Sequence, residues 1–245
     1  MKEGNCYIMN KISIIMPTYN REQYLNSRIF DFFECLKNYS SLELIVVDDG
    51  STDNTREMMQ YYSNKTDKIK YIRLNENSGS VSIPRAIGIV NSNSEYIAHQ
   101  DDDCVSYPLK YNILSELLDN DIEKKYTLAY GAWKNIAHPR YIEKYNASGP
   151  GVDNSQILYR REIFTTDKVP ICFPKRECDW FLMKKIQEIK PDSFIGKNEI
   201  VSEYIFHGKN RSLDDSTRTK KIYPEKYKSY LNTDKYIIDF EMKLI

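Results

Sequence analysis

The chain has 245 residues, which suits one large domain or a domain with an appendage, since a domain usually takes roughly 150 residues. Hydrophobic residues make up 41% and charged residues 29%, and 35 Lys and Arg balance 35 Asp and Glu, which excludes a disordered acidic tail, a collagen-like chain and a wholly basic nucleic-acid coat. The longest apolar runs fall far short of the roughly 18 residues of a membrane-spanning helix, and residues 1–10 carry no apolar segment, so we expect neither a transmembrane helix nor a secretory signal.

The five cysteines form no CxxC pair and are odd in number. This pattern predicts reduced thiols in a reducing compartment, rather than a disulfide framework or a zinc ribbon. A cytoplasmic location is the corresponding expectation.

Short apolar runs alternate with segments of helical period from residue 11 onward. This alternation is typical of βαβ units, in which helices connect the strands of a mostly parallel sheet. Beyond about residue 137 the alternation is less regular, and residues 146–151 form a clear loop cluster. The predicted strands, in chain order, are 13–16, 43–47, 69–74, 95–100, 127–133, 156–159 and 200–206.

The helices between these strands are predicted from apolar residues spaced three and four positions apart. The turn at residues 48–53 contains good capping residues for a helix through about Tyr62. Pro84 lies in the first turn of its helix, where a missing N–H costs nothing. The predicted inward-facing residues are Leu25, Ile29, Phe32 and Leu36 in the first helix, then Ile83, Ile87 and Val90, then Leu109, Ile113 and Leu117, and finally Leu182, Ile186 and Ile189.

Polar residues follow three of the predicted strands directly, at 17–20, 48–51 and 101–103. Ligands of an open parallel sheet bind beyond the carboxyl ends of its strands, so these segments are candidates for a shared site. Carboxylates from the last two segments would repel one another by several kcal/mol in a partly desolvated cleft unless a cation neutralised them. We therefore expect a divalent metal ion as their counterion.

The expected ligand of this site is a metal-bound nucleotide diphosphate. Mg²⁺ and Mn²⁺ prefer oxygen ligands and commonly keep water and substrate phosphates in their coordination shell, while a neighbouring carboxylate can bind a ribose hydroxyl. The sequence contains neither GxxxxGK[ST] nor GxGxxG, which argues against P-loop and Rossmann phosphate sites. We predict that a metal ion, rather than a glycine-rich backbone, holds the pyrophosphate.

Four segments together resemble the family 2 glycosyltransferases of GT-A fold: SIIMPTYNR at 13–21, LIVVDDGSTD at 44–53, NSG at 77–79 and DDD at 101–103. They occur in the expected order within residues 11–135. The resemblance implies an α/β GT-A fold, with a mostly parallel central sheet flanked by helices and a Rossmann-like nucleotide-binding half. It also implies transfer of a sugar from a nucleotide-sugar donor, most often a UDP-sugar, with inversion at the anomeric carbon.

The resemblance assigns roles to individual residues by position. Thr18 and Asp48 are expected to contact the nucleobase, Asp101 the ribose, and Asp103 the metal ion. Asp102 lies between the last two and could take either role. The other residues that the resemblance places near the nucleotide-sugar are Pro17, Tyr19, Asn20, Ser78, Gly79 and Arg85.

An inverting transferase needs a base on the face opposite the leaving group, because the acceptor hydroxyl loses its proton as it attacks. Glu177 and Asp179, at the start of a predicted helix, resemble the Glu-Asp segment of the family. Trp180 and Leu182 favour Asp179 as the base, with Glu177 as the alternative, and the helix N-terminus would keep either carboxylate ionised. A helix cap is the other interpretation of Asp179. The metal ion would replace a general acid by stabilising the departing diphosphate.

The remaining candidates are two histidines, two tryptophans and a basic segment. His207 resembles a metal or diphosphate contact of some relatives, and the alternative is a surface histidine beside a basic loop. His99, inside a strand, is predicted to be a hydrogen-bonded interior group. Trp133 and Trp180 could stack on sugar or pack in the core. Residues 209–228 contain seven Lys or Arg against three Asp or Glu, which suits a solvated surface, a phosphate-bearing acceptor or an anionic membrane surface.

We expect residues 1–245 to form a single domain, with a nucleotide-sugar-binding half at 11–135, an acceptor and catalytic-base half at 136–220 and a C-terminal extension at 221–245. The acceptor is expected to be a hydroxyl of a glycan, a lipid-linked molecule or another compound, and the zero net charge argues against nucleic acid. One alternative is a nucleotidyltransferase, although a glycine-rich basic loop is lacking after the first strand. Another is a non-catalytic carbohydrate- or nucleotide-binding module of the same fold.

Overall fold

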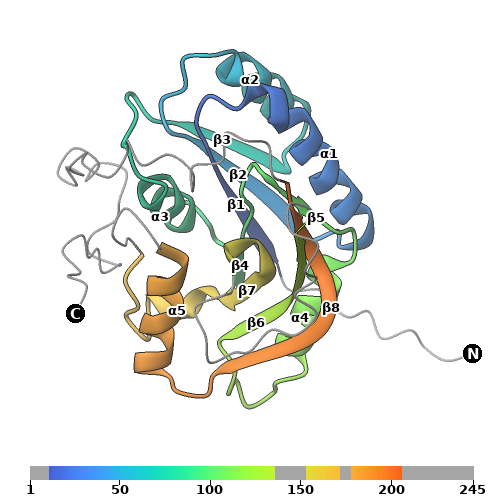
Figure 1. The fold of residues 1–245 in the computed structure, drawn as a ribbon, viewed down its shortest axis with the longest axis vertical. Helices are drawn as coiled ribbons and strands as arrows, with labels where there is room; N and C mark the ends of the chain where they lie inside the picture. The colour runs from blue at the N-terminus through green and yellow to red at the C-terminus, as the bar shows by residue number, and fades with distance from the viewer. Residues whose placement is uncertain (1–10, 136–152, 172–177, 206–245) are drawn as a thin grey trace, which may run out of the picture.

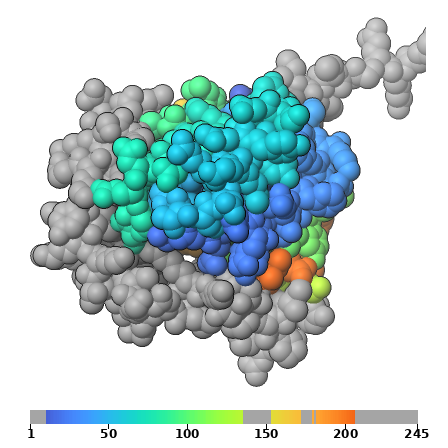
Figure 2. Space-filling model, turned by 90° about the horizontal axis from the view of Figure 1, so that it is seen from above, coloured from blue at the N-terminus to red at the C-terminus, as the bar shows by residue number. Residues whose placement is uncertain are grey.

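The computed structural model describes residues 11–135, 153–171 and 178–205, and these form a curled sheet flanked by helices (Figure 1). The eight strands of the sheet lie in the order β3-β2-β1-β4-β7-β6-β8-β5. Viewed from above, the described surface belongs mainly to the N-terminal half of the chain, coloured blue to teal (Figure 2). The strands are β1 (Ile12–Thr18), β2 (Leu42–Asp48), β3 (Ile69–Arg73), β4 (Tyr96–His99), β5 (Cys104–Ser106), β6 (Leu128–Asn135), β7 (Ile157–Arg160) and β8 (Phe194–Tyr204).

Helices cover both faces of the sheet, which explains why the strands are continuous apolar runs. Ile15 and Ile45 point to the face covered by α3 and α5, whereas Ile14 and Val46 point to the face covered by α1, α2 and α4. Both sets are buried. The helices are α1 (Glu22–Asn38), α2 (Thr55–Lys65), α3 (Ser82–Val90), α4 (Lys110–Asp119) and α5 (Cys178–Ile189), with two short 3-10 helices, η1 (Asn154–Gln156) and η2 (Arg161–Phe164).

Neighbouring strands are parallel from β3 through β2 and β1 to β4, as predicted. These pairs need crossover connections, which α1, α2 and α3 provide. The rest of the sheet is mixed, because β7 runs antiparallel to β4 and β6, β8 runs parallel to β6, and β5 runs antiparallel to β8. Strands from both expected halves thus share one sheet, while the domain boundaries stay predictions.

Two strands differ from the prediction. β5 was not expected, because it has three residues and follows directly on three aspartates. β8 begins at Phe194 rather than at residue 200, and its exposed residues 196–199 (GKNE) interrupt the apolar pattern. The short length of β5 and the exposure of the first part of β8 explain why the sequence did not indicate them.

The predicted inward face of α4 is correct only in part. Leu109 precedes the helix and is 54% exposed, whereas Ile113 and Leu117 are partly buried and pack against the core. A second set of residues with the helical spacing of three and four is buried more deeply. Ile189 of α5 was also expected to face inward and is exposed. The hydrophobic residues that α4 buries are Tyr111, Leu114 and Leu118.

Several predictions concern parts of the chain that lie outside the described residues. They are the roles of Glu177 and His207, the loop at 146–151 and the basic segment at 209–228; the side chain of Trp180 is likewise not described. None of the helices in the described ranges has the length and apolar character needed to cross a bilayer.

Candidate active site

The polar segments predicted to share a site lie at one edge of the sheet. The register of β1 with β2 pairs Thr18 with Asp48, and β4 ends at His99 beside Ile15, so that residues 100–103 follow at the same edge. A hydrogen bond from the backbone N–H of Asp49 to the carbonyl of Thr18 (2.9 Å) joins the two strand ends. The convergence expected from the strand ends is therefore confirmed at the level of the backbone.

Asp48 has no exposed surface, and its carboxylate is held by protein groups. Its Oδ1 accepts from the Ser51 backbone N–H (2.8 Å), and its Oδ2 accepts from the Tyr71 hydroxyl (2.6 Å) and lies 3.5 Å from Nε of Arg73. Burial and the hydrogen bond to Asp48 raise the pKa of Tyr71. The expected nucleobase contact of Asp48 stays a prediction.

Asp49, to which the sequence analysis gave no role, links the end of β2 to the loop at 77–79. Its carboxylate accepts from the backbone N–H and the hydroxyl of Ser78 (both 2.9 Å) and from Nδ2 of Asn77 (3.1 Å). Gly50 next to it has φ +76°, and a Cβ there would lie 2.6 Å from the backbone carbon of Glu76. The pair of adjacent aspartates was the available signal for this residue.

Asn20 connects the β1 loop to the turn after β2. Its φ is 53°, its Oδ1 accepts from the Thr52 backbone N–H (2.8 Å), and its own N–H donates to the Ser51 hydroxyl (2.9 Å). Pro17 lies within β1, paired with Val47, while Tyr19 is 42% exposed. Of these predicted nucleotide contacts, Tyr19 therefore presents the side chain to solvent and Asn20 shapes the loop.

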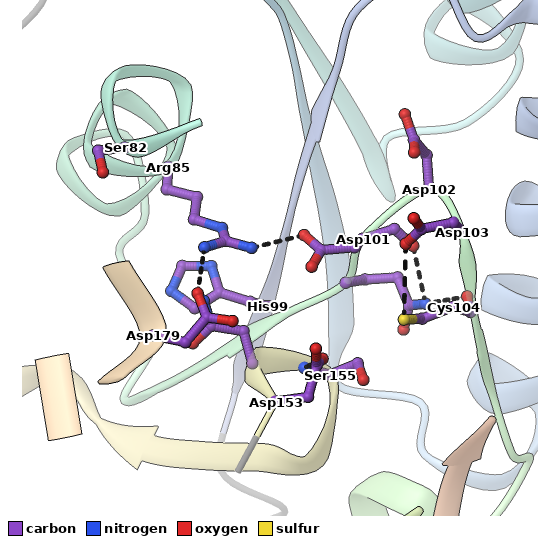
Figure 3. A network of polar contacts seen from close by, with 12 residues as sticks. Ser82, Arg85, His99, Asp101, Asp102, Asp103, Cys104, Asp153, Ser155 and Asp179 are labelled. Atoms are coloured by element: carbon purple, nitrogen blue, oxygen red, sulfur yellow. Dashed lines mark hydrogen bonds and ion pairs between the residues drawn. The ribbon is translucent and has the colours of Figure 1, made fainter. Parts of the chain in front are cut away.

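Arg85 of α3 joins two acidic residues that are far apart in the sequence (Figure 3). Its Nη2 lies 2.6 Å from Oδ1 of Asp101, and its Nη1 lies 2.7 Å from Oδ1 of Asp179 in the first turn of α5. Burial raises the pKa of Asp101, and the Arg85 charge opposes this rise. The structure thus brings Arg85, Asp101 and the predicted base Asp179 together.

Two residues of the η1 segment complete this part of the site, and sequence reasoning missed both. Asn154 donates from Nδ2 to Oδ1 of Asp179 (2.5 Å). Burial, together with the nearby charges of Asp179 and Asp101, raises the pKa of Asp153 to about 7. Both residues lie in an irregular segment that directly follows residues 136–152, which are outside the described ranges. No periodic pattern in the sequence indicates their role.

The three aspartates at 101–103, here called the acidic turn, point in different directions (Figure 3). Asp102 Oδ2 accepts from the Thr18 hydroxyl (3.4 Å), and Oδ1 lies 3.5 Å from Nε of Arg21. Burial raises the pKa of Asp102 to about 7 although Arg21 lowers it. Asp103 Oδ1 lies 3.7 Å from the Cys104 sulfur. The acidic turn therefore faces both the β1 end and the Arg85 bridge.

The expected gathering of acidic side chains around one cation is not seen among the described residues. Within those ranges, no group of three or more His, Cys, Asp or Glu is arranged to hold a metal ion. Guanidinium groups neutralise the carboxylates instead, with Arg73 at Asp48, Arg21 at Asp102 and Arg85 at Asp101. A divalent ion still fits the acidic turn, because Mg²⁺ and similar ions need only one or two protein carboxylates when substrate phosphates and water complete the shell.

His99 lies under the Arg85 bridge and is buried, as predicted, but it is not fully hydrogen-bonded. Its Nε2 pairs with the Tyr159 hydroxyl, whereas Nδ1 has no partner among the described residues. Burial, with the nearby charges of Arg85 and Lys110, lowers its pKa far below the usual value, so the ring is neutral. Oδ1 of Asn154 is a second buried polar atom without a protein partner in the described part of the chain.

Both the sequence and the fold match those of known proteins. A family model described as glycosyl transferase family 2 matches residues 13–167. The poly(ribitol-phosphate) beta-N-acetylglucosaminyltransferase TarP of Staphylococcus aureus is 30% identical over 156 residues, covering 62% of this chain and 46% of TarP. An uncharacterized glycosyltransferase of Nostoc sp. is 26% identical over 96% of this chain and 76% of its own length. The chain thus spans less than half the length of TarP.

Two solved structures share the fold. Staphylococcus aureus TarS 1–349 in complex with UDP-GlcNAc superposes with a TM-score of 0.69 at 19% identity, over 90% of this chain and 64% of that one. A mannosyltransferase of Pyrobaculum calidifontis in complex with GDP-Man and Mn²⁺ gives a TM-score of 0.64 at 15% identity, over 94% and 70%. With the family match over more than half of the chain, these findings show that the protein belongs to the family 2 glycosyltransferases, a family of glycosyl transfer enzymes, and has their GT-A fold.

Proposed function

We propose that this protein is an inverting glycosyltransferase that moves a sugar from a nucleotide-sugar donor to an acceptor hydroxyl in glycan or polysaccharide synthesis. The observation that carries this proposal is the bridge that Arg85 makes between Asp101 and Asp179. Asp101 belongs to the acidic turn, and Asp179 is the predicted base, so the bridge joins the expected donor side to the expected acceptor side. The comparisons give no support to a nucleotidyltransferase or to a non-catalytic module.

A UDP-sugar is the proposed donor. TarS has been solved in complex with UDP-GlcNAc and with UDP, and the Pyrobaculum enzyme in complex with GDP-Man, so the fold accepts either nucleobase. Thr18 and Asp48, at the paired ends of β1 and β2, are the proposed nucleobase contacts. The other residues proposed around the nucleotide are Pro17, Tyr19, Asn20, Ser78 and Gly79.

The ribose contact is proposed to be Asp102 rather than Asp101. The resemblance assigned the ribose to Asp101, with Asp102 able to take the same role. Asp102 faces Thr18 at the β1 end, whereas Asp101 faces Arg85 on the other side of the acidic turn. Since nucleobase and ribose are joined directly, the carboxylate beside Thr18 is the better placed of the two.

Asp179 is the proposed base. Asp179 lies in the first turn of α5, and Arg85 and Asn154 both contact its Oδ1, which orients the carboxylate. Asp179 would accept the proton of the acceptor hydroxyl as the hydroxyl oxygen attacks the anomeric carbon. The bond from that carbon to the diphosphate breaks on the opposite face, and the nucleoside diphosphate leaves with the bonding electrons. Glu177 remains the alternative base, outside the described residues.

Asp103 is the proposed protein ligand of a Mn²⁺ or Mg²⁺ ion, with His207, outside the described residues, as the second candidate. Oxygen donors of the acidic turn suit these hard cations. The ion would stabilise negative charge on the departing diphosphate. The Mn²⁺ named with the Pyrobaculum structure supports a divalent ion in this fold.

The acceptor is proposed to be a hydroxyl of a glycan, a lipid-linked molecule or a related compound. TarP and TarS are named for transfer to poly(ribitol-phosphate), which makes a polyol or sugar polymer the first acceptor to test. A cytoplasmic location and contact of the basic C-terminal segment with a membrane surface stay predictions.

The test is a panel of nucleotide-sugars with Mn²⁺, in which released nucleoside diphosphate and transferred sugar are measured. Asp179→Asn should lower transfer by about 10²- to 10⁴-fold, the contribution of a general base, while the Kd for UDP changes by less than about threefold. Glu188→Gln, an exposed carboxylate on the same helix, is the matched control and should keep full activity.

Other outcomes would correct particular parts of the proposal. Loss of transfer in Glu177→Gln but not in Asp179→Asn would move the base by two residues. Transfer that survives both EDTA and Asp103→Ala would remove the metal ion from the reaction. Release of pyrophosphate in place of nucleoside diphosphate would indicate nucleotidyl transfer.

A further inference from the structure

The backbone of the acidic turn is held at each of its ends. The N–H of Cys104 donates to the carbonyl of Asp101 (3.1 Å), which closes a tight turn. The N–H of Ile205, just after β8, donates to the carbonyl of Asp103 (2.8 Å). Because the three side chains leave this turn in different directions, small changes in its backbone would re-aim all three carboxylates.

Gln100, the residue before the turn, adds a side-chain clamp. Its amide Nε2 donates to the carbonyl of Asp101 (3.2 Å) and to the carbonyl of Cys104, so one side chain binds both ends of the turn. Its backbone N–H donates to the carbonyl of Ile15 in β1 (3.0 Å), which ties the clamp to the central sheet. Gln100 is 4% exposed, so water does not compete for these bonds.

A buried lysine determines which way the Gln100 amide faces. Lys110, at the start of α4, has no exposed surface, and its Nζ lies 3.1 Å from the Ser106 hydroxyl oxygen. An ammonium group can only donate, so Ser106 accepts from Lys110 and uses its own hydrogen to donate to Oε1 of Gln100. With Oε1 bound in this way, Nε2 is left facing the two carbonyls.

We propose that Gln100 is a positioning residue for the proposed transfer reaction, and that Ser106 and Lys110 fix its amide. We call Lys110, Ser106 and Gln100 the relay. Each donates a hydrogen bond to the next, and Gln100 donates to the backbone of the acidic turn. The effect of the relay is to aim Asp102 and Asp103 at the ribose and metal positions assigned above, so the inference rests on the proposed function. All three residues are buried.

The test measures binding of UDP by calorimetry, with Mn²⁺ and with EDTA, and unfolding by heat. Gln100→Met keeps the volume and removes the donor, and Ser106→Ala removes the hydroxyl that orients the amide. Changes behind metal ligands typically cost about 10- to 100-fold in metal affinity. We therefore expect the ratio of the Kd in EDTA to the Kd in Mn²⁺ to fall by about tenfold in Gln100→Met, and by a smaller factor in Ser106→Ala.

The matched control is Thr127→Val, which also removes a buried hydrogen bond, the one from Thr127 to the Ser193 hydroxyl (2.8 Å) before β6. It should leave the Kd ratio within about twofold of the wild-type value. If it lowers the ratio as much as Gln100→Met, the effect is a general loss of stability and the inference is overturned.

The remaining outcomes separate the inference from the proposed function. Gln100→Met that is folded and keeps the wild-type Kd ratio overturns the inference alone. If Gln100→Met does not fold, Ser106→Ala decides by the same criterion. A wild-type protein that binds UDP no more tightly with Mn²⁺ than with EDTA would instead contradict the proposed metal-bound nucleotide.

Discussion

Replacing Arg85 by methionine removes a guanidinium that contacts two carboxylates, Asp101 Oδ1 at 2.6 Å and Asp179 Oδ1 at 2.7 Å. The Arg85 side chain is 7% exposed, and the two acidic side chains are 23% and 26% exposed. After the change, both charges stay in a poorly solvated site without their cation. Breaking a buried ion pair in this way costs about 3–5 kcal/mol, and the partial exposure of the acids places the expected loss near 3 kcal/mol.

The loss of stability in Arg85→Met should depend on pH. Burial raises the pKa of Asp101, and Arg85 opposes that rise, so removing Arg85 raises the pKa further. The neighbouring Asp153 already has a pKa of about 7. A carboxylate whose pKa is higher in the folded state than in the unfolded state destabilises the fold when ionised, and this cost disappears as the pH falls through the folded pKa. The deficit should therefore be largest near about pH 8 and shrink toward about pH 5.

Urea unfolding of the wild type and Arg85→Met at these two pH values is the measurement. Arg56→Met, at an exposed arginine of α2, is the control and should change the unfolding free energy by less than about 0.5 kcal/mol. A deficit below about 1 kcal/mol at pH 8, or one of equal size at both pH values, would refute the assignment of Arg85 as the buried counterion of this site.

Two further predictions concern the supports of the site. Gly50→Ala places a side chain on a residue at φ +76° and within 2.6 Å of the Glu76 backbone, so the unfolding free energy should fall by more than about 1 kcal/mol; an unchanged urea midpoint would contradict this. Lys110→Met removes an ammonium whose burial lowers its pKa from 10.5 to about 8. Because the folded pKa lies below the unfolded one, the buried charge destabilises the wild type below about pH 8, and this cost fades as the pH rises toward 10. The variant should be more stable than the wild type by about 1–4 kcal/mol at pH 6 and lose that advantage by pH 10, whereas an advantage that is constant with pH would argue against a buried charged lysine.

The parallel half of the sheet could be predicted from the sequence because its strands are buried on both faces. Runs such as residues 44–47 must then be apolar throughout, and the polar residues that follow them mark the carboxyl edge where ligands bind. The same local signals carried the family resemblance, which the family match over residues 13–167 confirms. Parallel pairing between β1, β2 and β4 followed from the helices between them.

The less regular half could not be predicted to the same degree. Residues 196–199 of β8 are exposed and lack apolar side chains, and the pairing of β8 with β6 includes register shifts, so no periodic pattern indicates the length or the register of this strand. In α4, two sets of residues share the helical spacing, and only packing against the sheet decided that Tyr111, Leu114 and Leu118 are buried more deeply than the predicted set.

The site, too, could be predicted from the sequence only in part. Local sequence determined that carboxylates would end β2 and follow β4, because a strand end and its turn involve neighbouring residues. The contacts of those carboxylates depend on residues far away along the chain, since Arg85 meets Asp179 across 94 positions and Tyr71 meets Asp48 across 23. Charge balance in a folded protein is set by distance in space, and for that reason only the tertiary structure decided which arginine lies beside each acidic side chain.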